Sequence, residues 1–246
     1  FPIGPIYPIT PFNFPINLFA HKVAPAIAVG NPIIWKPAPQ TPISAIIFGK
    51  MIAEEVGIEG FISVLPLEIP LAEKLVKDER IKMLSFTGSD KVGWYLRDIA
   101  RKKKVLLELG GNAACIVEPD GDIETAIKKI VIGAFANAGQ VCISVQRVML
   151  HQDIYEKAKE LILEESKKVK AGDPFLDDVV VGPMIDLSAI ERAKSWINKA
   201  IKAGANLLLG GEVSEKTILL PTILENVPSG LEVSCREVFA PIMVLY

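Results

Sequence analysis

Short apolar runs alternate with longer segments of mixed polarity along the first half of the chain. The short runs are typical of buried strands and span 3–10, 26–30, 33–36, 61–65, 81–87 and 105–109. The longer segments repeat apolar residues at helical spacing and span 15–20, 41–57, 71–77 and 91–103. This alternation of strands and helices predicts a parallel sheet that is covered by helices.

The segment 41–57 contains clear local signals for a helix. Thr41 is a suitable N-cap, Pro42 fits the first helical position, and Gly57 is suited to end the helix. One side of this helix is apolar and consists of Ile43, Ile46, Ile47, Met51 and Ile52. Their spacing is that of an amphipathic helix.

The second half of the chain repeats the alternation. Strands are predicted at 114–117, 145–150 and 206–209, and helices at 122–138, 154–170 and 187–203. The helix at 122–138 has acidic residues in its first turn, which the helix dipole favours. We place a domain boundary just after Glu108, at Gly110-Gly111, which divides an α/β protein into domains 1–109 and 110–246.

The composition excludes several classes of function. Half of the 246 residues are hydrophobic and the net charge is −2, which suits a sizeable core in one large or two smaller domains. No basic stripe is present to neutralise phosphates, so we expect no nucleic acid partner. We also expect no membrane partner, because the apolar N-terminal stretch is interrupted by Pro2, Pro5, Pro8, Pro11 and Pro15.

The use of cysteine and histidine indicates the redox environment. The three cysteines (Cys115, Cys142 and Cys235) form no CxxC pair, and His21 lies far from His151. This pattern argues against a disulfide scaffold or a metal site and fits a reducing, cytoplasmic location. The scarcity of glutamine beside abundant Ile, Glu and Lys hints at a thermophilic source.

Two stretches carry candidate chemistry. Cys142 follows Gly139-Gln140-Val141 on the connection between a helix and a strand, where reactive groups are commonly displayed. Glu108 interrupts an apolar strand just before Gly110-Gly111, where desolvation would raise its pKa and suit it to act as a general base. Taken alone, the thiol could also be a small buried residue, and the carboxylate a salt-bridge partner at a strand end.

Both stretches resemble a known family. Glu108-Leu109-Gly110-Gly111 followed by Gly139-Gln140-Val141-Cys142 is similar to the active-site pair of the NAD(P)-dependent aldehyde dehydrogenases. Further motifs in the family's order are Pro11-Phe12-Asn13-Phe14-Pro15, Lys36-Pro37-Ala38, Phe86-Thr87-Gly88-Ser89 and Glu237-Val238-Phe239-Ala240-Pro241. The chain most resembles the branch of lactaldehyde, semialdehyde and non-phosphorylating glyceraldehyde-3-phosphate dehydrogenases.

The resemblance implies a Rossmann-type nucleotide-binding domain followed by an α/β catalytic domain. Because the family's chains are longer at both ends, we expect both domains to be incomplete here and the full-length protein to be a homo-oligomer. The implied reaction oxidises a small-molecule aldehyde to an acid. Cys142 would attack the aldehyde, and after hydride transfer Glu108 would activate the water that hydrolyses the thioester. Asn13 and the backbone N–H of Cys142 would donate to the oxyanion.

The cofactor implied by the resemblance is NADP or NAD. Lys36 would contact the adenosine ribose, and the turn Thr87-Gly88-Ser89 would bind the pyrophosphate at a helix N-terminus. Glu237 would hold the hydroxyls of the nicotinamide ribose, with Phe239 packed beside it. Pro39 stands where NAD-preferring members often carry Glu, so the sequence favours or at least permits NADP.

Other interpretations remain open from the sequence. The chain could be a thiol-dependent ester hydrolase, a catalytically inactive fragment that retains the fold, or an acylating reductase that forms a CoA thioester. Lys36 and Glu237 favour the dehydrogenase, because a hydrolase needs no ribose contacts. Val141 stands where members that act on phosphorylated glyceraldehyde commonly carry Arg, which favours a non-phosphorylated aldehyde such as lactaldehyde or a semialdehyde. The segment 66–70 lacks the glycines that the family usually places near the adenine, and Phe12 replaces its usual Trp.

Overall fold

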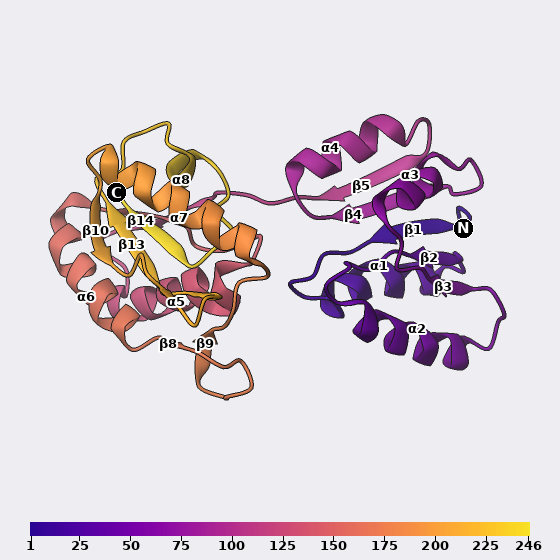
Figure 1. Ribbon diagram of the computed structural model, residues 1–246, viewed down its shortest axis with the longest axis horizontal. Coiled ribbons are helices and arrows are strands. Elements are labelled where there is room, and N and C mark those ends of the chain that lie inside the picture. The colour runs from indigo at the N-terminus through magenta and orange to yellow at the C-terminus, as the bar shows by residue number, and fades with distance from the viewer. The chain divides into compact units, whose positions relative to one another are not determined.

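The structure is a computed structural model that describes residues 1–246. The chain forms two compact units, residues 1–110 and residues 111–246, and each has a sheet and a core of its own (Figure 1). No helix in either unit is both long and apolar enough to cross a membrane. The roles expected for the two parts, nucleotide binding and thiol chemistry, stay predictions.

A parallel five-stranded sheet forms the centre of the first unit. Its strands are β1 (Ile6–Ile9), β2 (Ile33–Trp35), β3 (Ile62–Val64), β4 (Met83–Thr87) and β5 (Lys104–Glu108). They lie in the order β3-β2-β1-β4-β5, which is that of a Rossmann-type sheet. The parallel sheet expected from the alternation is confirmed here. Its strand order reverses where β1 lies beside β4, and ligands of such folds bind outside the carboxyl ends of the strands at that point.

Helices cover both faces of this sheet. They are α1 (Asn17–Ala28), α2 (Pro42–Val56), α3 (Ile69–Lys77) and α4 (Asp90–Ile99). Figure 1 shows α1 and α2 on one side and α3 and α4 on the other. Successive residues of β1 point to opposite faces, so Ile6 joins the core beneath α1 and α2, whereas Tyr7 joins the core beneath α3 and α4.

Two predicted boundaries in the first unit are wrong. The run 26–30 is not a strand, because α1 continues past Pro25 and ends at Ala28. This helix keeps a buried side that includes Phe19 and Val23, and packing of that side outweighs the missing N–H of the proline. Helix α4 ends at Ile99 instead of continuing to 103, and Arg101 then takes a left-handed conformation with φ of 59°.

Helix α2 begins and ends where the sequence places it. Pro42 lies in its first turn, and Gly57 follows its last residue in the left-handed conformation, with φ of 64°. The side that packs on the sheet, however, is formed by Ala45 and Gly49. A Cβ at Gly49 would collide with Val64 of β3, so the helix and the strand approach closely.

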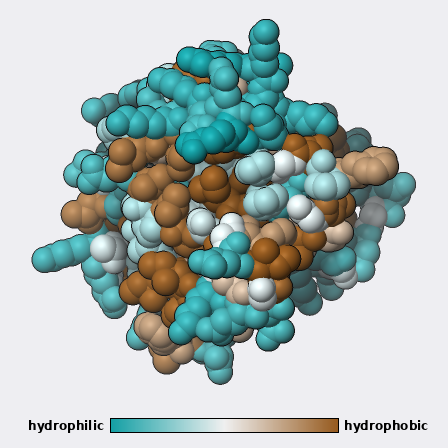
Figure 2. All heavy atoms as spheres, turned by 90° about the vertical axis from the view of Figure 1, so that its right-hand side faces the viewer, coloured by the Kyte–Doolittle hydropathy of each residue, from teal (hydrophilic) through white to brown (hydrophobic).

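The isoleucine-rich side of α2 is therefore not its packed side. Most of the apolar residues that mark it in the sequence are exposed, namely Ile43, Ile46, Ile47 and Met51. Figure 2 views the molecule from the right-hand side of Figure 1. On this face, hydrophobic residues (brown) form groups between hydrophilic ones (teal).

A mixed five-stranded sheet forms the centre of the second unit. Its strands are β6 (Ala114–Val117), β7 (Arg147–Leu150), β10 (Asn206–Leu209), β13 (Thr222–Glu225) and β14 (Ile242–Leu245), in the order β10-β13-β14-β7-β6. The parallel pairing expected from the alternation holds for β13, β14, β7 and β6, whereas β10 departs from it and runs antiparallel to β13. Between these two strands the chain contains no helix that could provide a parallel crossover. Two small ladders pair β8 (Lys170–Ala171) with β9 (Val179–Val181), and β11 (Val213–Ser214) with β12 (Ile218–Leu219).

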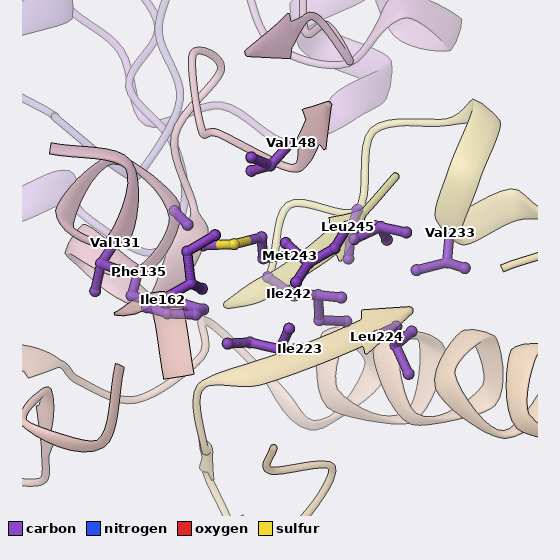
Figure 3. Packing of buried hydrophobic residues seen from close by; sticks show 14 of the residues in the cluster. Val131, Phe135, Val148, Ile162, Ile223, Leu224, Val233, Ile242, Met243 and Leu245 are labelled. Atoms are coloured by element: carbon purple, nitrogen blue, oxygen red, sulfur yellow. The ribbon is translucent and has the colours of Figure 1, made fainter. Parts of the chain in front are cut away.

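The helices of the second unit pack around the largest hydrophobic core of the chain. They are α5 (Ile123–Phe135), α6 (Tyr155–Lys167), α7 (Leu187–Lys202) and the short α8 (Glu232–Cys235), with 3₁₀ turns η1 (Ala136–Gly139) and η2 (Gln152–Ile154). Figure 3 shows Phe135 of α5 and Ile162 of α6 close to Ile223 of β13 and to Met243 of β14, all members of one buried cluster.

Helix α5 differs from its predicted extent only at its end. Its N-terminus is capped by Asp122, which accepts a hydrogen bond from the backbone N–H of Thr125 at 3.2 Å. The helix stops at Phe135 and not at 138, because Asn137 and Ala138 have φ of 53° and 56°. These left-handed residues turn the chain toward the thiol.

The orientation of α2 can be tested with two isoleucines of the first unit. Replacing Ile33, which is 1% exposed, with Ala should lower the free energy of unfolding by about 2–5 kcal/mol, because it leaves a cavity. The same change at Ile47, which is 57% exposed, should alter it by less than about 0.5 kcal/mol. Urea denaturation of both variants measures the difference. Equal losses would show that the isoleucine side of α2 is covered in solution.

Candidate active site

Glu108 is held by two side chains at the end of β5. The register of β4 and β5 pairs Thr87 with Glu108, and the hydroxyl of Thr87 donates a hydrogen bond to Glu108 Oε2 at 2.6 Å. The same oxygen accepts a hydrogen bond from Lys22 Nζ of α1 at 3.1 Å. The Lys22 side chain is 1% exposed and that of Glu108 is 42% exposed. The salt bridge considered as the alternative for Glu108 is thus present, on a carboxylate that still faces outward.

The environment of Glu108 lowers its pKa on balance. Burial raises the pKa, but the hydrogen bonds from Thr87 and Lys22 and the charge of Lys22 outweigh burial and hold it below the ordinary 4.5. Desolvation thus acts in the expected direction, but the expectation of a raised pKa is wrong, because the hydrogen bonds and the charge of Lys22 reverse the net shift. The carboxylate is charged at neutral pH and can accept a proton without first losing one. Because its pKa is depressed, its ionisation stabilises the fold above pH 4.5, and this contribution is lost as the pH falls through the folded-state pKa.

The pKa of Lys22 is shifted by the same arrangement. Burial lowers the pKa of Lys22, although the hydrogen bond and the negative charge of Glu108 act in the opposite direction. A buried ammonium without this carboxylate would lack compensation, so each charge depends on the other. The sequence analysis missed Lys22. The signal that could have found it is a lone lysine among Phe19, Val23 and Ala26 on the buried side of a helix.

The other expected residues of the first unit follow the carboxyl ends of its strands. Asn13 comes after β1 and Lys36 directly after β2, where the backbone N–H of Lys36 donates to Pro8 O at 2.9 Å. Lys36 Nζ donates to Pro37 O at 3.2 Å, and burial lowers its pKa. Pro39 is exposed in the loop that leads to α2. The structure therefore brings these residues to the same edge of the sheet as Glu108.

Gly88 and Ser89 connect β4 to α4 at this edge. The backbone N–H of Gly88 donates to Glu108 O at 3.1 Å, and a Cβ at Gly88 would lie 2.6 Å from Cζ of Phe86. Only glycine fits this packing, which leaves the backbone before the helix N-terminus bare. Ser89 is exposed at the N-cap position, and its side chain makes no capping bond. A backbone of this kind, in front of a helix dipole, suits a phosphate group.

Cys142 lies at the corner of a turn in the second unit. The backbone N–H of Ser144 donates to Val141 O at 3.0 Å and closes the turn, and the Ser144 hydroxyl donates to Ala134 O of α5 at 3.2 Å. The thiol is exposed. The alternative of a small buried cysteine is therefore wrong for Cys142, whereas Cys115 is half-buried in β6 and burial raises its pKa.

The turn is anchored on both sides. Gly139 has φ of 64°, and a Cβ at this position would collide with the carbonyl group of Ala240. The side chain of Gln140 is buried; its Oε1 accepts from the backbone N–H of Ile185 at 2.9 Å. The structure thereby brings the thiol turn against the segment that carries Glu237 and Phe239.

Glu237 and Phe239 lie on the connection from α8 to β14. Phe239 has a left-handed φ of 52°, which is rare for a bulky residue. Val238 between them is fully buried, and both its backbone polar groups are bonded to side chains, which belong to Gln146 and Arg192. Sequence reasoning missed Gln146 and Arg192, which lie 92 and 46 positions from Val238. The expected site residues thus form two groups, one in each unit.

The fold and these two groups define a protein with a Rossmann-type unit followed by a thiol-bearing α/β unit. The chain belongs to the aldehyde dehydrogenase family, which it matches over residues 1–246. It is 42% identical to a 3-sulfolactaldehyde dehydrogenase of Priestia megaterium, over 99% of this chain and 51% of that protein. It is 40% identical to a lactaldehyde dehydrogenase of Methanococcus aeolicus, over 98% of this chain and 53% of that protein.

Solved structures give the same result. Aldehyde dehydrogenase 21 of Physcomitrella patens, in complex with the product succinate, is 43% identical with a TM-score of 0.94, over 100% of this chain and 51% of that one. The glyceraldehyde-3-phosphate dehydrogenase GapN of Methanocaldococcus jannaschii, complexed with NADP, is 38% identical with a TM-score of 0.95, over 99% of this chain and 54% of that one. The chain therefore spans about half the length of these relatives.

The ion pair can be tested by replacing Lys22 with Met. The variant removes one hydrogen bond and one positive charge from Glu108 while burial remains, so the pKa of the carboxyl should rise. A ¹³C NMR titration of the Glu108 carboxyl measures the direction of the change. Lys50→Met, which removes an exposed lysine paired with Glu54 in the same unit, should leave this pKa in place. An unchanged titration in Lys22→Met would contradict the assigned balance of burial and charge.

Proposed function

We propose that the natural protein that carries this chain oxidises a small aldehyde to a carboxylic acid with NADP or NAD, through a thioester on Cys142. The observation that carries the proposal is the exposed thiol on a turn that is packed, through Gly139, against the segment of Glu237. A nucleophile and a candidate ribose ligand thereby share one rigid scaffold. Membership of the aldehyde dehydrogenase family supports the same chemistry.

The thiol and the carboxylate divide the reaction between them. Cys142 Sγ, as the thiolate, adds to the aldehyde carbon, and the carbonyl oxygen becomes an oxyanion that Asn13 and the backbone N–H of Cys142 stabilise. A bound nicotinamide would supply the acceptor for the hydride of this carbon, and loss of the hydride would leave the acyl group on Cys142 Sγ as a thioester. Glu108 then takes a proton from a water molecule, whose oxygen attacks the thioester carbon and releases the acid and the thiolate.

The residues of both units suit a dinucleotide. Lys36 supplies a cation at the carboxyl edge of the first sheet, and Gly88 leaves bare backbone before α4 for the pyrophosphate. Glu237 supplies a carboxylate for the hydroxyls of the nicotinamide ribose, with Phe239 beside it. The hydroxyl of Thr87 already donates to Glu108, so the expected contact of Thr87 with the cofactor would be made by its backbone. Its backbone and that of Ser89 remain the candidates for phosphate contact.

The proposed substrate is a small aldehyde without phosphate. Val141 precedes the thiol and offers no donor to hold a phosphate group. The names of the relatives, which include lactaldehyde and 3-sulfolactaldehyde dehydrogenases, support a short aldehyde of this class. Homo-oligomerisation, a cytoplasmic location and a thermophilic source remain predictions from the sequence.

The division of labour between Cys142 and Glu108 can be tested with Glu108→Gln. The variant should still produce a burst of reduced nicotinamide, because hydride transfer does not need the base, whereas hydrolysis of the thioester should slow by about 10²–10⁴-fold. Rapid mixing of the natural protein with an aldehyde and each cofactor separates the two phases. Cys142→Ser should show neither phase, and Cys115→Ser serves as the matched control with both.

The outcome also discriminates the rival functions. A burst and a steady state that fall equally in Glu108→Gln would reject the base role. Release of acid from an ester with no dinucleotide present, combined with no aldehyde oxidation, would favour the hydrolase. A Cys142→Ser variant that keeps its turnover would reject the covalent mechanism.

The choice of cofactor can be tested at Pro39. A carboxylate at this position would repel the 2′-phosphate of NADP, and a single charge pair of this kind near a surface changes the NADP/NAD ratio by about tenfold. In Pro39→Glu, kcat/KM should therefore fall for NADP and change little for NAD. Gln152→Glu adds the same charge at an exposed position of the second unit and should leave the ratio unaltered. Strict use of NAD by the parent, unchanged in Pro39→Glu, would overturn the argument.

A further inference from the structure

Gln146 is a buried polar residue between the thiol turn and β7. It lies four positions after Cys142 and is 4% exposed. Its backbone N–H donates to Ser144 O at 3.0 Å, and its carbonyl oxygen accepts from the N–H of Val244 of β14 at 2.8 Å. The main chain of Gln146 is therefore fixed by both the turn and the sheet.

The side chain of Gln146 is directed entirely at the segment 233–238. Its Nε2 donates to Arg236 O at 2.7 Å and to Val233 O at 3.0 Å, and its Oε1 accepts from the backbone N–H of Val238 at 2.8 Å. Both donors and the acceptor of the amide are thus used. Only an amide of this length can serve two carbonyl groups and one N–H at the same time.

Arg192 of α7 holds the other side of the same peptide segment. Its Nη1 donates to Val238 O at 2.7 Å, and its guanidinium lies over the ring of Trp196 at 5.4 Å from the centroid. Val238 therefore has its N–H bonded to Gln146 and its carbonyl oxygen bonded to Arg192. These two side chains are called the Val238 clamp below.

The Val238 clamp restrains the backbone on which Glu237 and Phe239, the two neighbours of Val238, are placed. A bulky residue with φ of 52° costs free energy and persists only where the surrounding structure imposes it. Beyond Phe239, Ala240 is packed against Gly139. Three contacts from separate elements thus determine how this short connection leaves α8 and enters β14.

We propose that Gln146 and Arg192 are positioning residues that set the direction of Glu237, and thereby the grip of the protein on the nicotinamide ribose. The proposal rests on the proposed function, in which Glu237 contacts that ribose. Because Gln146 is also bonded to the thiol turn, the clamp fixes the ribose ligand relative to Cys142 within one unit. Neither residue touches the substrate in this role.

The test measures which part of the cofactor loses affinity. In the natural protein, Gln146→Met and Arg192→Met should each weaken binding of NADPH or NADH by about tenfold, the effect of losing one or two hydrogen bonds that hold a ligand in place. ADP and 2′,5′-ADP lack the nicotinamide ribose, so their affinity should be unchanged. KM for the dinucleotide should rise more than kcat falls. Fluorescence titration and steady-state kinetics supply these values.

A matched control separates positioning from general loss of stability. Ile162→Val shortens a fully buried side chain of α6 in the same unit and should lower the melting temperature without a change in dinucleotide affinity. Gln146→Glu keeps the oxygen that accepts from the N–H of Val238 but loses both hydrogen bonds that Nε2 donates, so it should also weaken binding of the dinucleotide. If Gln146→Met does not fold, Arg192→Met carries the same test, because it leaves every bond of Gln146 in place.

A double-mutant cycle with Glu237→Gln shows whether the clamp acts through Glu237. If it does, Gln146→Met should have little further effect on dinucleotide affinity once Glu237 is replaced. Three results would each overturn the proposed role of the Val238 clamp. They are parent-like dinucleotide affinity in Gln146→Met and Arg192→Met, losses of affinity that are additive with that of Glu237→Gln, and equal losses of affinity for ADP. Failure of the proposed function gives a different result, namely a parent that binds no dinucleotide or a Glu237→Gln variant that binds it normally.

Discussion

The second unit depends on a backbone contact that leaves no room for a side chain. Gly139, at the end of η1, lies against the carbonyl group of Ala240, and it takes a left-handed φ of 64° to do so. The two residues before it are left-handed as well. This sequence of unusual conformations lets the chain reverse after α5 and present Cys142 at an exposed corner. Strain of this kind is tolerated because α5, the β14 connection and Gln140 determine the turn from several sides.

The first unit meets a different constraint, which is electrostatic. A buried ammonium, Lys22, and an outward-facing carboxylate, Glu108, compensate each other at the end of the sheet. The buried ammonium would be costly alone, and its positive charge helps to keep the carboxylate ionised. In the proposed role of a base, a carboxylate with a depressed pKa is weaker than a desolvated one, but it is already ionised at neutral pH. The ion pair therefore keeps the carboxylate ionised at the expense of its basicity. Thr87 and Lys22 both donate a hydrogen bond to the same oxygen, Oε2.

The sequence predicted features that depend on neighbouring residues and missed those that depend on distant ones. Thr41-Pro42 and Gly57 located α2, because capping and backbone preferences act within one turn. The packed side of the same helix was not predictable from its isoleucines, since close approach to Val64 selects the smallest residues, Ala45 and Gly49. Hydrophobic residues indicate that a side of a helix can be buried, whereas packing against the neighbouring strand determines which side is buried.

The candidate site follows the same rule. Cys142 and Glu108 were found because each stands in a short motif. The direction of the Glu108 pKa was predicted wrongly, because it is set by hydrogen bonds from Thr87 and from Lys22, which lies 86 positions away. Gln146 lies beside the motif of Cys142 and still gave no signal, since its amide is explained only by carbonyl groups about ninety residues further on. A motif identifies the atoms that are candidates for the chemistry. The residues that aim those atoms are distributed over the fold, and hydrogen-bond partners in three dimensions are needed to recognise them.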